Sequence, residues 1–312
     1  MKIAWCFPGQ GAQFVGMGKE LFEASSAARD VFDRADDALG EKISRLCFEG
    51  PEAELVLTEN TQPAIVTTSI AALAAIRERV PNLPPPAFAA GHSLGEYSAL
   101  VAAGALGLED AVRTVRLRGR AMQEAVPASR GAMAAIMALS PEKVRELCNE
   151  ASEGEVVAPA NFNAPGQIVI AGEANAVARA CKLAGSKGGK AIPLKVSAPF
   201  HCALMAPAAR ALEKGLAPIV VGPLAFPVIA NVDASPNSDA GMVKDLLVRQ
   251  VDSPVRWEES VRVMAQAGVT HVLEIGPGKV LAGLIKRITK TITVIPVGDL
   301  AGVDAAAKLY AS

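Results

Sequence analysis

The amino-acid sequence predicts an α/β fold in which helices cover both faces of a mainly parallel sheet, with a small α+β insert in the middle of the chain. Two observations support this prediction. Short apolar runs alternate with longer helical patterns in residues 1–127 and again in residues 199–312. Between these two parts the elements are shorter and follow each other more closely. We therefore expect a core formed by residues 1–127 and 199–312, and an inserted subdomain formed by residues 128–198.

The first part of the chain begins with an apolar run, which Pro8-Gly9 closes, so a buried strand followed by a tight loop is expected. A proline-rich stretch precedes the second strand, and Gly104 stands where a helix C-cap is expected. The elements predicted here are strands over Ile3–Phe7 and Ala87–Ala90 and helices over roughly Lys19–Ala38, Ala64–Arg79, Leu94–Ala103 and Leu108–Ala125.

The middle part alternates short strands and helices in the order β-α-β-β-α-β, which is typical of a ferredoxin-like subdomain. Ser140 is the expected N-cap of its first helix. The predicted elements are strands over Ala132–Ala138, Val156–Asn161, Gln167–Gly172 and Lys190–Val196 and helices over Pro141–Ala151 and Ala174–Ser186. In the last part, strands are expected near Phe226–Ala230, His271–Ile275 and Thr291–Pro296.

Composition limits the classes of function. Hydrophobic residues make up 51% of the 312 residues, which is enough for a large core. The net charge of −1 gives no indication of a nucleic acid or a membrane surface as partner. The five cysteines are scattered and the three histidines lack ligand spacing, so we expect reduced cysteines and no metal. The chain shows neither a secretory signal nor a membrane span, and a cytoplasmic protein is expected.

Gly91-His92-Ser93-Leu94-Gly95 has the pattern of a nucleophile elbow. The two glycines allow a sharp turn that exposes the Ser93 hydroxyl, and the helix that follows favours negative charge at its N-terminus. An apolar strand comes before the pattern and an amphipathic helix after it, as in the core of α/β-hydrolases. We interpret Ser93 as the nucleophile of an acyl-transfer enzyme.

A serine nucleophile needs a base, and histidine is the usual one. His92 adjoins the nucleophile, so its side chain is expected to point away from the path to Ser93 Oγ. His271 lies inside an apolar strand pattern, where a core histidine with satisfied hydrogen bonds is expected. His201 lies in the loop Ser197–Cys202, where the insert returns to the core, and a cleft tends to form at such a junction. By elimination, His201 is the predicted base.

Arg118 lies at the edge of the apolar face of its predicted helix, whereas Arg113, Arg116 and Arg120 fall on the opposite, solvated face. A buried guanidinium needs an anionic partner. This partner is either an internal Asp or Glu or a carboxylate on the substrate, held by two hydrogen bonds. The helical pattern leaves both alternatives open.

The segment Phe7-Pro-Gly-Gln-Gly11 follows the first strand and could offer backbone N–H groups to an oxyanion, together with the N–H of Leu94. Several segments then match a known pattern in order along nearly the whole chain. They are Phe7–Gly11, Thr61-Gln-Pro-Ala64, Gly91-His-Ser-Leu-Gly-Glu-Tyr97, Arg118-Gly119 with Met122-Gln123, Asn161-Phe-Asn-Ala-Pro-Gly-Gln167, Phe200-His201, Asn231 and Gln250. With these motifs the chain resembles the malonyl-CoA:acyl-carrier-protein transacylase family of fatty-acid and polyketide synthesis.

The resemblance implies a ping-pong transfer of malonyl from coenzyme A through a Ser93 ester to the phosphopantetheine thiol of a carrier protein. It implies His201 as the base, oriented by a backbone carbonyl near Gln250, and oxyanion donors at the N–H groups of Gln10 and Leu94. It implies further that Arg118 binds the malonyl carboxylate. The other substrate-binding residues that it indicates are Gln10, His92, Met122, Asn161, Asn163, Phe200 and Gln250. Phe200 resembles the residue of malonyl-selective relatives, since relatives that take methylmalonyl tend to carry Ser there.

The resemblance also implies a monomer with no permanently bound cofactor and a transient acyl carrier protein partner. Acidic carrier proteins suggest a basic rim at the cleft, for which the candidates are Lys190, Lys195, Lys286, Arg287 and Lys290. Two alternatives remain. A serine hydrolase of the α/β-hydrolase class would use a late histidine, such as His271, and a non-catalytic module that binds carrier proteins would not need an elbow serine.

Overall fold

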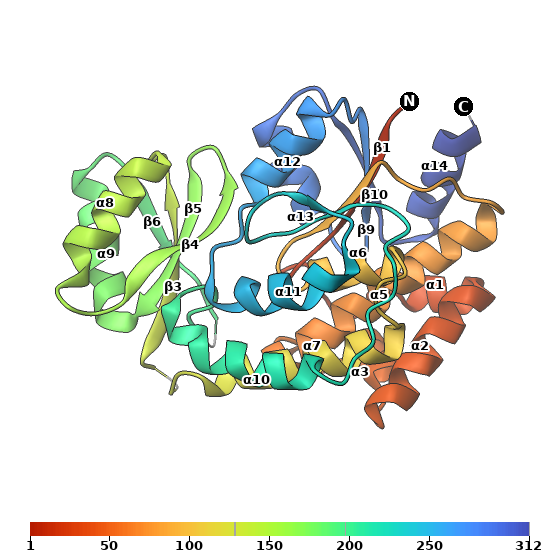
Figure 1. Cartoon of the computed structure of the whole chain (residues 1–312), viewed down its shortest axis with the longest axis horizontal. Coiled ribbons are helices and arrows are strands. Elements are labelled where there is room, and N and C mark those ends of the chain that lie inside the picture. The colour runs from red at the N-terminus through yellow and green to blue at the C-terminus, as the bar shows by residue number, and fades with distance from the viewer. Residues whose placement is uncertain (128, 197, 312) are drawn as a thin grey trace.

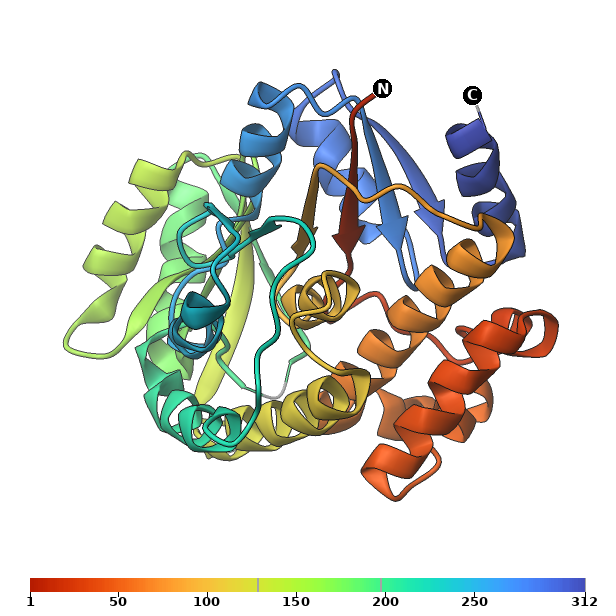
Figure 2. The same cartoon turned by 45° about the vertical axis from the view of Figure 1, so that its right-hand side comes forward.

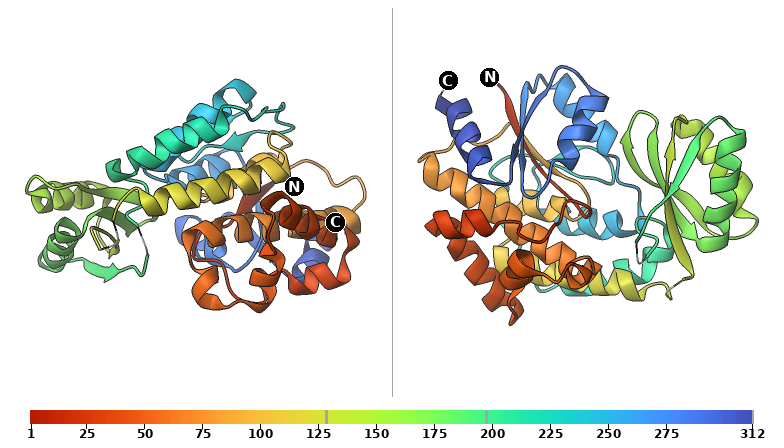
Figure 3. Two further views of the ribbon diagram at one scale, coloured as in Figure 1. Left: turned by 90° about the horizontal axis from the view of Figure 1, so that it is seen from below. Right: turned by 180° about the vertical axis from the view of Figure 1, so that it is seen from behind.

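The computed structural model describes residues 1–127, 129–196 and 198–311. It has a large core with the smaller insert at one end (Figure 1). Both termini lie in the core, away from the insert (Figure 3). The predicted start of the insert at residue 128, Ser197 in the His201 loop and the end of the core at residue 312 lie outside the described residues. The boundaries 1–127, 128–198 and 199–312 therefore stay predictions.

The core contains a six-stranded sheet in the order β10-β9-β1-β2-β7-β8. All neighbours in it run parallel except β7 and β8, so the predicted, mainly parallel sheet is confirmed. The central strand β1 is buried along almost its whole length, which explains its continuous apolar sequence. The strands are β1 Ile3–Phe7, β2 Phe88–Gly91, β7 Val228–Ile229, β8 Pro236–Asn237, β9 His271–Ile275 and β10 Thr293–Val297.

Helices cover both faces of this sheet (Figure 2). On one face, α5 and α14 pack in the cluster that contains Trp5 and Leu273. On the other face, α12 and α13 pack against Ala4 and Val272. The helices of the core are α1 Lys19–Ala24, α2 Ser26–Leu39, α3 Ile43–Glu49, α4 Glu52–Leu55, α5 Thr58–Arg79, α6 Gly95–Ala102, α7 Leu108–Glu124, α10 Ala206–Leu216, α11 Val243–Asp252, α12 Trp257–Gln266, α13 Val280–Ile288 and α14 Leu300–Ala311, with short 3₁₀ helices at Ala203–Met205 and Ala240–Met242.

The insert carries an antiparallel sheet in the order β4-β5-β3-β6, with two helices on one face. This order and the β-α-β-β-α-β sequence of elements confirm the ferredoxin-like prediction. Ser140 caps α8 as expected, since its hydroxyl accepts from the Lys143 N–H. The elements are β3 Gly131–Met137, α8 Pro141–Ser152, β4 Val157–Ala164, β5 Gln167–Glu173, α9 Ala174–Ser186 and β6 Lys190–Pro193.

Strand β4 joins the insert to the core. The N–H of Val255, a core residue, donates to Ala160 O at 2.9 Å, and the N–H of Phe162 donates to Val255 O at 2.9 Å. On the face of the insert sheet away from α8 and α9, Met133 and Val169 belong to the large core cluster. The insert is thus packed against the core through side chains that also reach the cleft described below.

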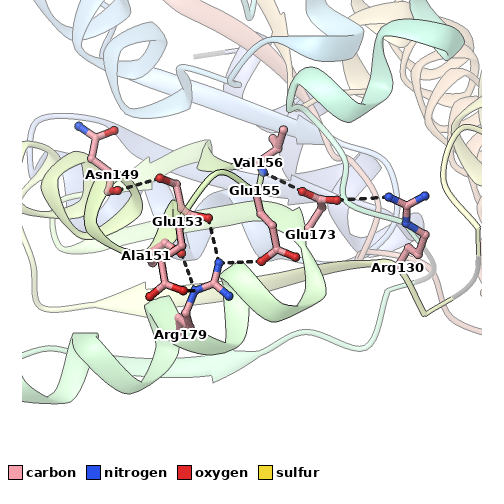
Figure 4. A network of polar contacts seen from close by, with 9 residues as sticks. Arg130, Asn149, Ala151, Glu153, Glu155, Val156, Glu173 and Arg179 are labelled. Atoms are coloured by element: carbon pink, nitrogen blue, oxygen red, sulfur yellow. Dashed lines mark hydrogen bonds and ion pairs between the residues drawn. The ribbon is translucent and has the colours of Figure 1, made fainter.

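A polar network holds the end of α8 to α9 and β5 (Figure 4). Arg179 of α9 donates to Ala151 O at 2.8 Å and pairs with Glu155 at 2.6 Å. Glu173 accepts from the N–H of Val156 at 2.9 Å. These contacts satisfy backbone groups where α8 ends and β4 begins, so they stabilise the chain reversal that the insert requires.

Several element boundaries differ from the sequence predictions. The helix expected over Lys19–Ala38 is two helices, because Ser25 has extended backbone and its hydroxyl caps α2 by accepting from Ala28 N. Helix α5 begins at Thr58 and includes Pro63. Helices α3 and α4 and strand β8 were not expected, and β6 ends at Pro193 rather than at Val196. Short helices without a long apolar repeat leave little periodicity to detect.

All five cysteines are free, and Cys6, Cys47, Cys148 and Cys202 are buried. Burial raises the pKa of Cys148 to about 12 and that of Cys202 to about 11, as for structural thiols. In the part of the chain that the structure describes, no helix combines the length and the apolar character that crossing a bilayer requires.

Candidate active site

Ser93 stands in the turn between β2 and α6 with a φ of +52°, in the left-handed region that a non-glycine residue rarely adopts. The two glycines of the pattern are required by close contacts. A Cβ on Gly91 would lie 1.9 Å from Gly95 C, and a Cβ on Gly95 would lie 2.3 Å from Phe7 O. The turn therefore has the geometry of a nucleophile elbow, and it exposes Ser93 Oγ at the carboxyl end of the parallel sheet.

Two amide side chains hold the backbone of this turn. Asn231 Oδ1 accepts from Ser93 N at 2.7 Å, and Asn231 Nδ2 donates to Gly91 O at 2.6 Å. On the other side, Gln250 Nε2 donates to Ser93 O at 3.0 Å. Both amides are buried, with exposed fractions of 1% and 0%. The two amides thus hold the backbone groups of the strained turn, in addition to the hydrogen bond that Ser93 O accepts from Glu96 N at 3.0 Å.

His201 lies against the serine. Its Nε2 is 2.7 Å from Ser93 Oγ, and its Nδ1 donates to the backbone carbonyl of Gln250 at 2.9 Å. Since the carbonyl can only accept, the proton is assigned to Nδ1 and Nε2 is left to accept from the serine. The pKa of His201 is lowered to about 3, first by burial and then by the charge of Arg118. The imidazole is therefore neutral near pH 7 and able to take a proton.

Arg118 lies on the other side of the same hydroxyl. Its Nη2 donates to Ser93 Oγ at 3.0 Å and to Gln250 Oε1 at 2.9 Å, and its Nη1 donates to Gln62 Oε1 at 2.8 Å. The side chain is only 2% exposed, and burial lowers its pKa. No Asp or Glu among the described residues lies within ion-pair distance of it. Of the two alternatives left open above, the internal ion pair is thus not found in this part of the chain.

The helical pattern placed Arg118 correctly but Arg116 wrongly. Arg116, which was expected on the solvated face, is 7% exposed and contacts Glu41 and the amide oxygen of Asn60. Asn60 belongs to α5 and Glu41 to the loop between α2 and α3, so segments distant in the sequence cover this side of α7, and a pattern within one helix does not show such neighbours.

A cleft of about 170 Å³ opens in front of Ser93 Oγ, between the core and the insert. His92 also lines this cleft, and its Nε2 lies 2.8 Å from Asn163 Oδ1 in β4. The structure brings the predicted residues together here: Gln10, His92, Ser93, Leu94, Arg118, Met122, Asn161, Asn163, Phe200 and His201 line the cleft, and Gln250 lies behind them. Gln62 and the apolar side chains of Met133, Val169, Leu194 and Val196, none of which the sequence analysis assigned to a site, line it as well.

The backbone N–H groups of Gln10 and Leu94 border the cleft, and neither donates to another of the described residues. Leu94 is the N-cap of α6, where N–H groups lack helix partners and carry partial positive charge. The side chain of Gln10 is held by Thr58, with Nε2 3.3 Å from Thr58 Oγ1. The two N–H groups can therefore bind an oxyanion formed next to Ser93.

His271 lies at the opposite end of the sheet. It is paired with Ile3 at the start of β1, whereas Gly91 is paired with Phe7 at the end of the same strand. Its Nδ1 lies 3.0 Å from Thr270 Oγ1 and its side chain is partly exposed, so it is not the core residue that the strand pattern suggested. A hydrolase mechanism with His271 as the base of Ser93 is excluded by this distance along the strands.

Three further residues of the site lie within the sequence motifs, but the motifs gave no indication of their roles. Gln62 holds Arg118, Asn231 holds the elbow, and Glu96 accepts hydrogen bonds from both Asn231 N and Gln250 Nε2. One sequence feature points to Glu96, because it is the only charged residue of the apolar helix Gly95–Ala102 and is buried there. No group of three or more His, Cys, Asp or Glu that could hold a metal occurs among the described residues.

The comparisons with known proteins agree in one family. The acyl transferase domain family matches residues 4–305. The malonyl CoA-acyl carrier protein transacylase of Bacillus subtilis is 51% identical over 300 residues, which cover 96% of this chain and 94% of that protein. The solved acyl-carrier-protein S-malonyltransferase of Bartonella henselae matches with a TM-score of 0.97 and 46% identity over 100% of both chains.

A further solved structure is similar along its whole length. It contains a type II polyketide synthase acyl carrier protein in complex with its malonyl-transacylase, and it matches with a TM-score of 0.96 and 45% identity, covering 99% of this chain and 100% of that one. The motifs of the sequence, the fold and these relatives lead to one conclusion: the chain belongs to the malonyl-CoA:acyl-carrier-protein transacylase family of acyl transferases.

Proposed function

We propose that this protein transfers the malonyl group of malonyl-CoA to the phosphopantetheine thiol of an acyl carrier protein, for fatty-acid or polyketide synthesis. One observation carries the proposal. Ser93 Oγ lies 2.7 Å from His201 Nε2 and 3.0 Å from Arg118 Nη2. A nucleophile with its base is suited to acyl transfer, and a buried guanidinium beside it is suited to an acyl group that ends in a carboxylate.

In the first half-reaction, His201 Nε2 takes the Ser93 proton while Oγ attacks the thioester carbonyl of malonyl-CoA. The tetrahedral intermediate places its negative oxygen at the N–H groups of Gln10 and Leu94. When the intermediate collapses, the C–S bond breaks, the proton on His201 passes to the sulfur, and free CoA leaves. The malonyl group remains as an ester on Ser93.

In the second half-reaction the phosphopantetheine thiol takes the place of CoA. His201 accepts the thiol proton, the sulfur attacks the ester carbonyl, and Ser93 leaves with the proton that His201 returns. The enzyme is regenerated unchanged, because the malonyl group passes to the thiol and the Ser93 hydroxyl regains its proton. The Gln250 carbonyl keeps the imidazole in the required tautomer through both halves, so no acidic third member is needed.

Arg118 selects the acyl group. Its guanidinium is held by the neutral amides of Gln62 and Gln250, so its charge is available to the malonyl carboxylate. In a buried site a charge-assisted pair is stronger than at the surface. An acetyl group makes no such contact, and we therefore propose that malonyl-CoA is preferred over acetyl-CoA.

The remaining residues shape the cleft. We propose that His92, held by Asn163, and Asn161 form the wall toward the insert, while Met122 and Phe200 form apolar surface around the malonyl chain. Phe200, which directly precedes His201, is expected to leave little room for a branched malonyl group. Like the relatives, the protein has no resident cofactor in this proposal, and the CoA thioester is its substrate.

The partner that we propose is an acyl carrier protein, which one of the similar solved structures contains. Lys190, Lys195, Lys286 and Lys290 are exposed and are candidates for contacts with an acidic partner. Arg287 also contacts Gln167 and the carbonyl of Pro165, so part of its hydrogen-bonding capacity is used within the protein. We further propose that the chain acts as a monomer in the cytoplasm, with which its five free cysteines accord.

Intact-mass measurement after mixing with malonyl-CoA tests the proposal. A malonyl adduct on Ser93 is expected in the wild type and no adduct in Ser93→Ala. Addition of a phosphopantetheinylated carrier protein is expected to remove the adduct and to yield malonyl carrier protein. Release of free malonate at the same rate with and without the carrier protein would instead identify a hydrolase.

A further inference from the structure

Glu96 is a buried carboxyl that none of the steps above uses. It lies in the first turn of α6, three residues after the nucleophile, and is 2% exposed. One oxygen, Oε2, accepts two hydrogen bonds: Asn231 N at 2.9 Å and Gln250 Nε2 at 2.8 Å. A carboxyl without an ion pair in such a position is costly to bury, so its presence calls for a reason.

The two residues that donate to the Glu96 carboxyl are also the two whose side chains hold the nucleophile. Asn231 binds Ser93 N and Gly91 O through its side chain, and Gln250 binds Ser93 O. Gln250 also binds His201 through its backbone carbonyl and Arg118 through its side-chain oxygen. The two residues that hold Ser93, His201 and Arg118 are thus both hydrogen-bonded to one carboxylate oxygen, Oε2 of Glu96.

A carboxylate is suited to this place because it only accepts hydrogen bonds. It therefore determines which end of the Gln250 amide faces it, namely the NH₂ group. The amide oxygen is then turned toward Arg118, where an acceptor is needed. If the amide were reversed, its NH₂ group would face the guanidinium, donor against donor, and Ser93 O would lose the hydrogen bond from Gln250 and keep only the one from the Glu96 N–H.

The charge state agrees with this geometry. The pKa of Glu96 is raised to about 7, because burial, with a smaller contribution from Asp233, outweighs the lowering by the hydrogen bonds from Gln250 and Asn231 and by the charge of Arg118. In either protonation state Oε2 can accept both hydrogen bonds, because a proton can occupy Oε1. The hydrogen bonds from Asn231 N and Gln250 Nε2 thus require an acceptor atom at the position of Oε2, whatever its charge.

We infer that Glu96 is a positioning residue, which fixes the Gln250 amide and the Asn231 backbone and through them the alignment of Ser93, His201 and Arg118. The inference rests on the proposed function, since it concerns the same acyl transfer. The inference goes beyond that function because it names a residue that touches neither the substrate nor the reacting atoms and yet affects the transfer rate.

Three variants of Glu96 test the inference. Glu96→Gln keeps an acceptor oxygen at the same reach and loses the charge, whereas Glu96→Asp keeps the charge and withdraws the acceptor by one methylene. Glu96→Leu removes the acceptor. The measurement is the rate of Ser93 malonylation per folded molecule at saturating malonyl-CoA, together with the KM for malonyl-CoA.

Glu274→Leu is the matched control. Glu274 is 0% exposed and also accepts two N–H groups, those of Leu281 and Ala282 at 2.8 Å each, but among the described residues it forms no hydrogen bond or ion pair with a residue of the cleft. This control separates the loss of a buried carboxyl from the loss of alignment. We expect it to lower the melting temperature and to leave the malonylation rate per folded molecule unchanged.

For Glu96→Leu we expect the saturated rate to fall about 100-fold, because a displacement of about 1 Å in the reacting groups has this effect. Glu96→Asp should lose about tenfold and Glu96→Gln at most about threefold, so that the neutral amide is more active than the charged, shorter acid. The inference is overturned if Glu96→Leu loses no more than Glu274→Leu, or if Glu96→Asp is at least as active as Glu96→Gln. If Glu96→Leu does not fold, the comparison of Glu96→Asp with Glu96→Gln decides alone. Absence of a malonyl adduct in the wild type would instead overturn the proposed function.

Discussion

Arg118 in the core and Arg179 in the insert each contact polar groups from several segments, but their partners are of different kinds. Arg179 donates to Ala151 O at 2.8 Å and Ser152 O at 2.9 Å, and it pairs with Glu155 at 2.6 Å and Glu153 at 3.4 Å (Figure 4). Its side chain is 28% exposed. Its charge is thus balanced within the insert, where it holds α8 and α9 together.

Arg118 is almost fully buried, yet its partners are two amide oxygens and a hydroxyl. Neutral dipoles satisfy the N–H groups of a guanidinium without cancelling its charge. The remaining charge lowers the pKa of His201 and is available to an anionic ligand. The comparison teaches that the partners of a buried arginine, rather than its burial, distinguish a structural ion pair from a binding site.

Removing the uncompensated charge should have the largest effect. We predict that Arg118→Ala lowers kcat/KM for malonyl-CoA about 100-fold or more, because a buried, hydrogen-bonded charge loses its partner. Transfer from acetyl-CoA, which has no carboxylate, should fall much less. Parallel assays with both thioesters provide the measurement, and unchanged malonyl transfer would show that Arg118 does not bind the carboxylate.

Giving Arg118 the kind of partner that Arg179 has should also reduce activity. In Gln62→Glu a carboxylate replaces the amide that lies 2.8 Å from Arg118 Nη1. We predict a KM for malonyl-CoA raised about tenfold or more, because the new charged hydrogen bond competes with the substrate. Steady-state kinetics measures this change, and Gln62→Met serves as the control that removes the amide without adding charge. A KM equal to that of the control would contradict the competition.

Removing Arg179 should affect stability and not catalysis. We predict that Arg179→Ala lowers the free energy of unfolding by about 1–3 kcal/mol, because the carbonyl groups of Ala151 and Ser152 lose a charged donor. Denaturant unfolding measures the loss, and the malonylation rate of the folded variant should equal that of the wild type. A large loss of rate without a loss of stability would show that the insert arginine acts on the site.

The smallest expected effect concerns His201. Its folded-state pKa lies below the ordinary value of 6.5, so the unfolded chain binds the proton more readily and stability falls as pH drops from 6.5 toward 3. We predict that its imidazole NMR signals do not titrate between pH 8 and 5. Arg118→Gln should raise this pKa but keep it below 6.5, since burial is the larger cause and remains. A titration midpoint near pH 6.5 for His201 in the wild type would contradict a buried imidazole beside the charge of Arg118.

Much of the fold followed from local patterns. The continuous apolar run of β1 and the order of elements in the insert were recognisable because each strand is short, apolar and bounded by turn residues. The break at Ser25 was missed, because Ser25 caps α2 in the middle of an unbroken helical pattern. Arg116 was placed on the wrong face, since the residues that cover it lie elsewhere in the sequence.

The site was partly predictable for the same reason. Ser93 could be identified because its elbow is encoded within five residues, and His201 because only three histidines compete. Gln62, Glu96 and Asn231 received no role, because each acts through a hydrogen bond to a partner far away in the sequence. Local spacing carries no information on such pairs.

The sequence by itself therefore determined the α/β class, the ferredoxin-like insert, the elbow serine and a buried arginine on α7, since all of these arise from periodicity and turn residues within a short stretch. Only the tertiary structure decided that the arginine faces amides instead of carboxylates, and that Ser93, His201 and Arg118 are held by Gln250 and Asn231. The physical reason is that these contacts join residues from 49 (His201 and Gln250) to 138 (Ser93 and Asn231) positions apart in the sequence, and packing of the whole chain brings them within hydrogen-bond distance.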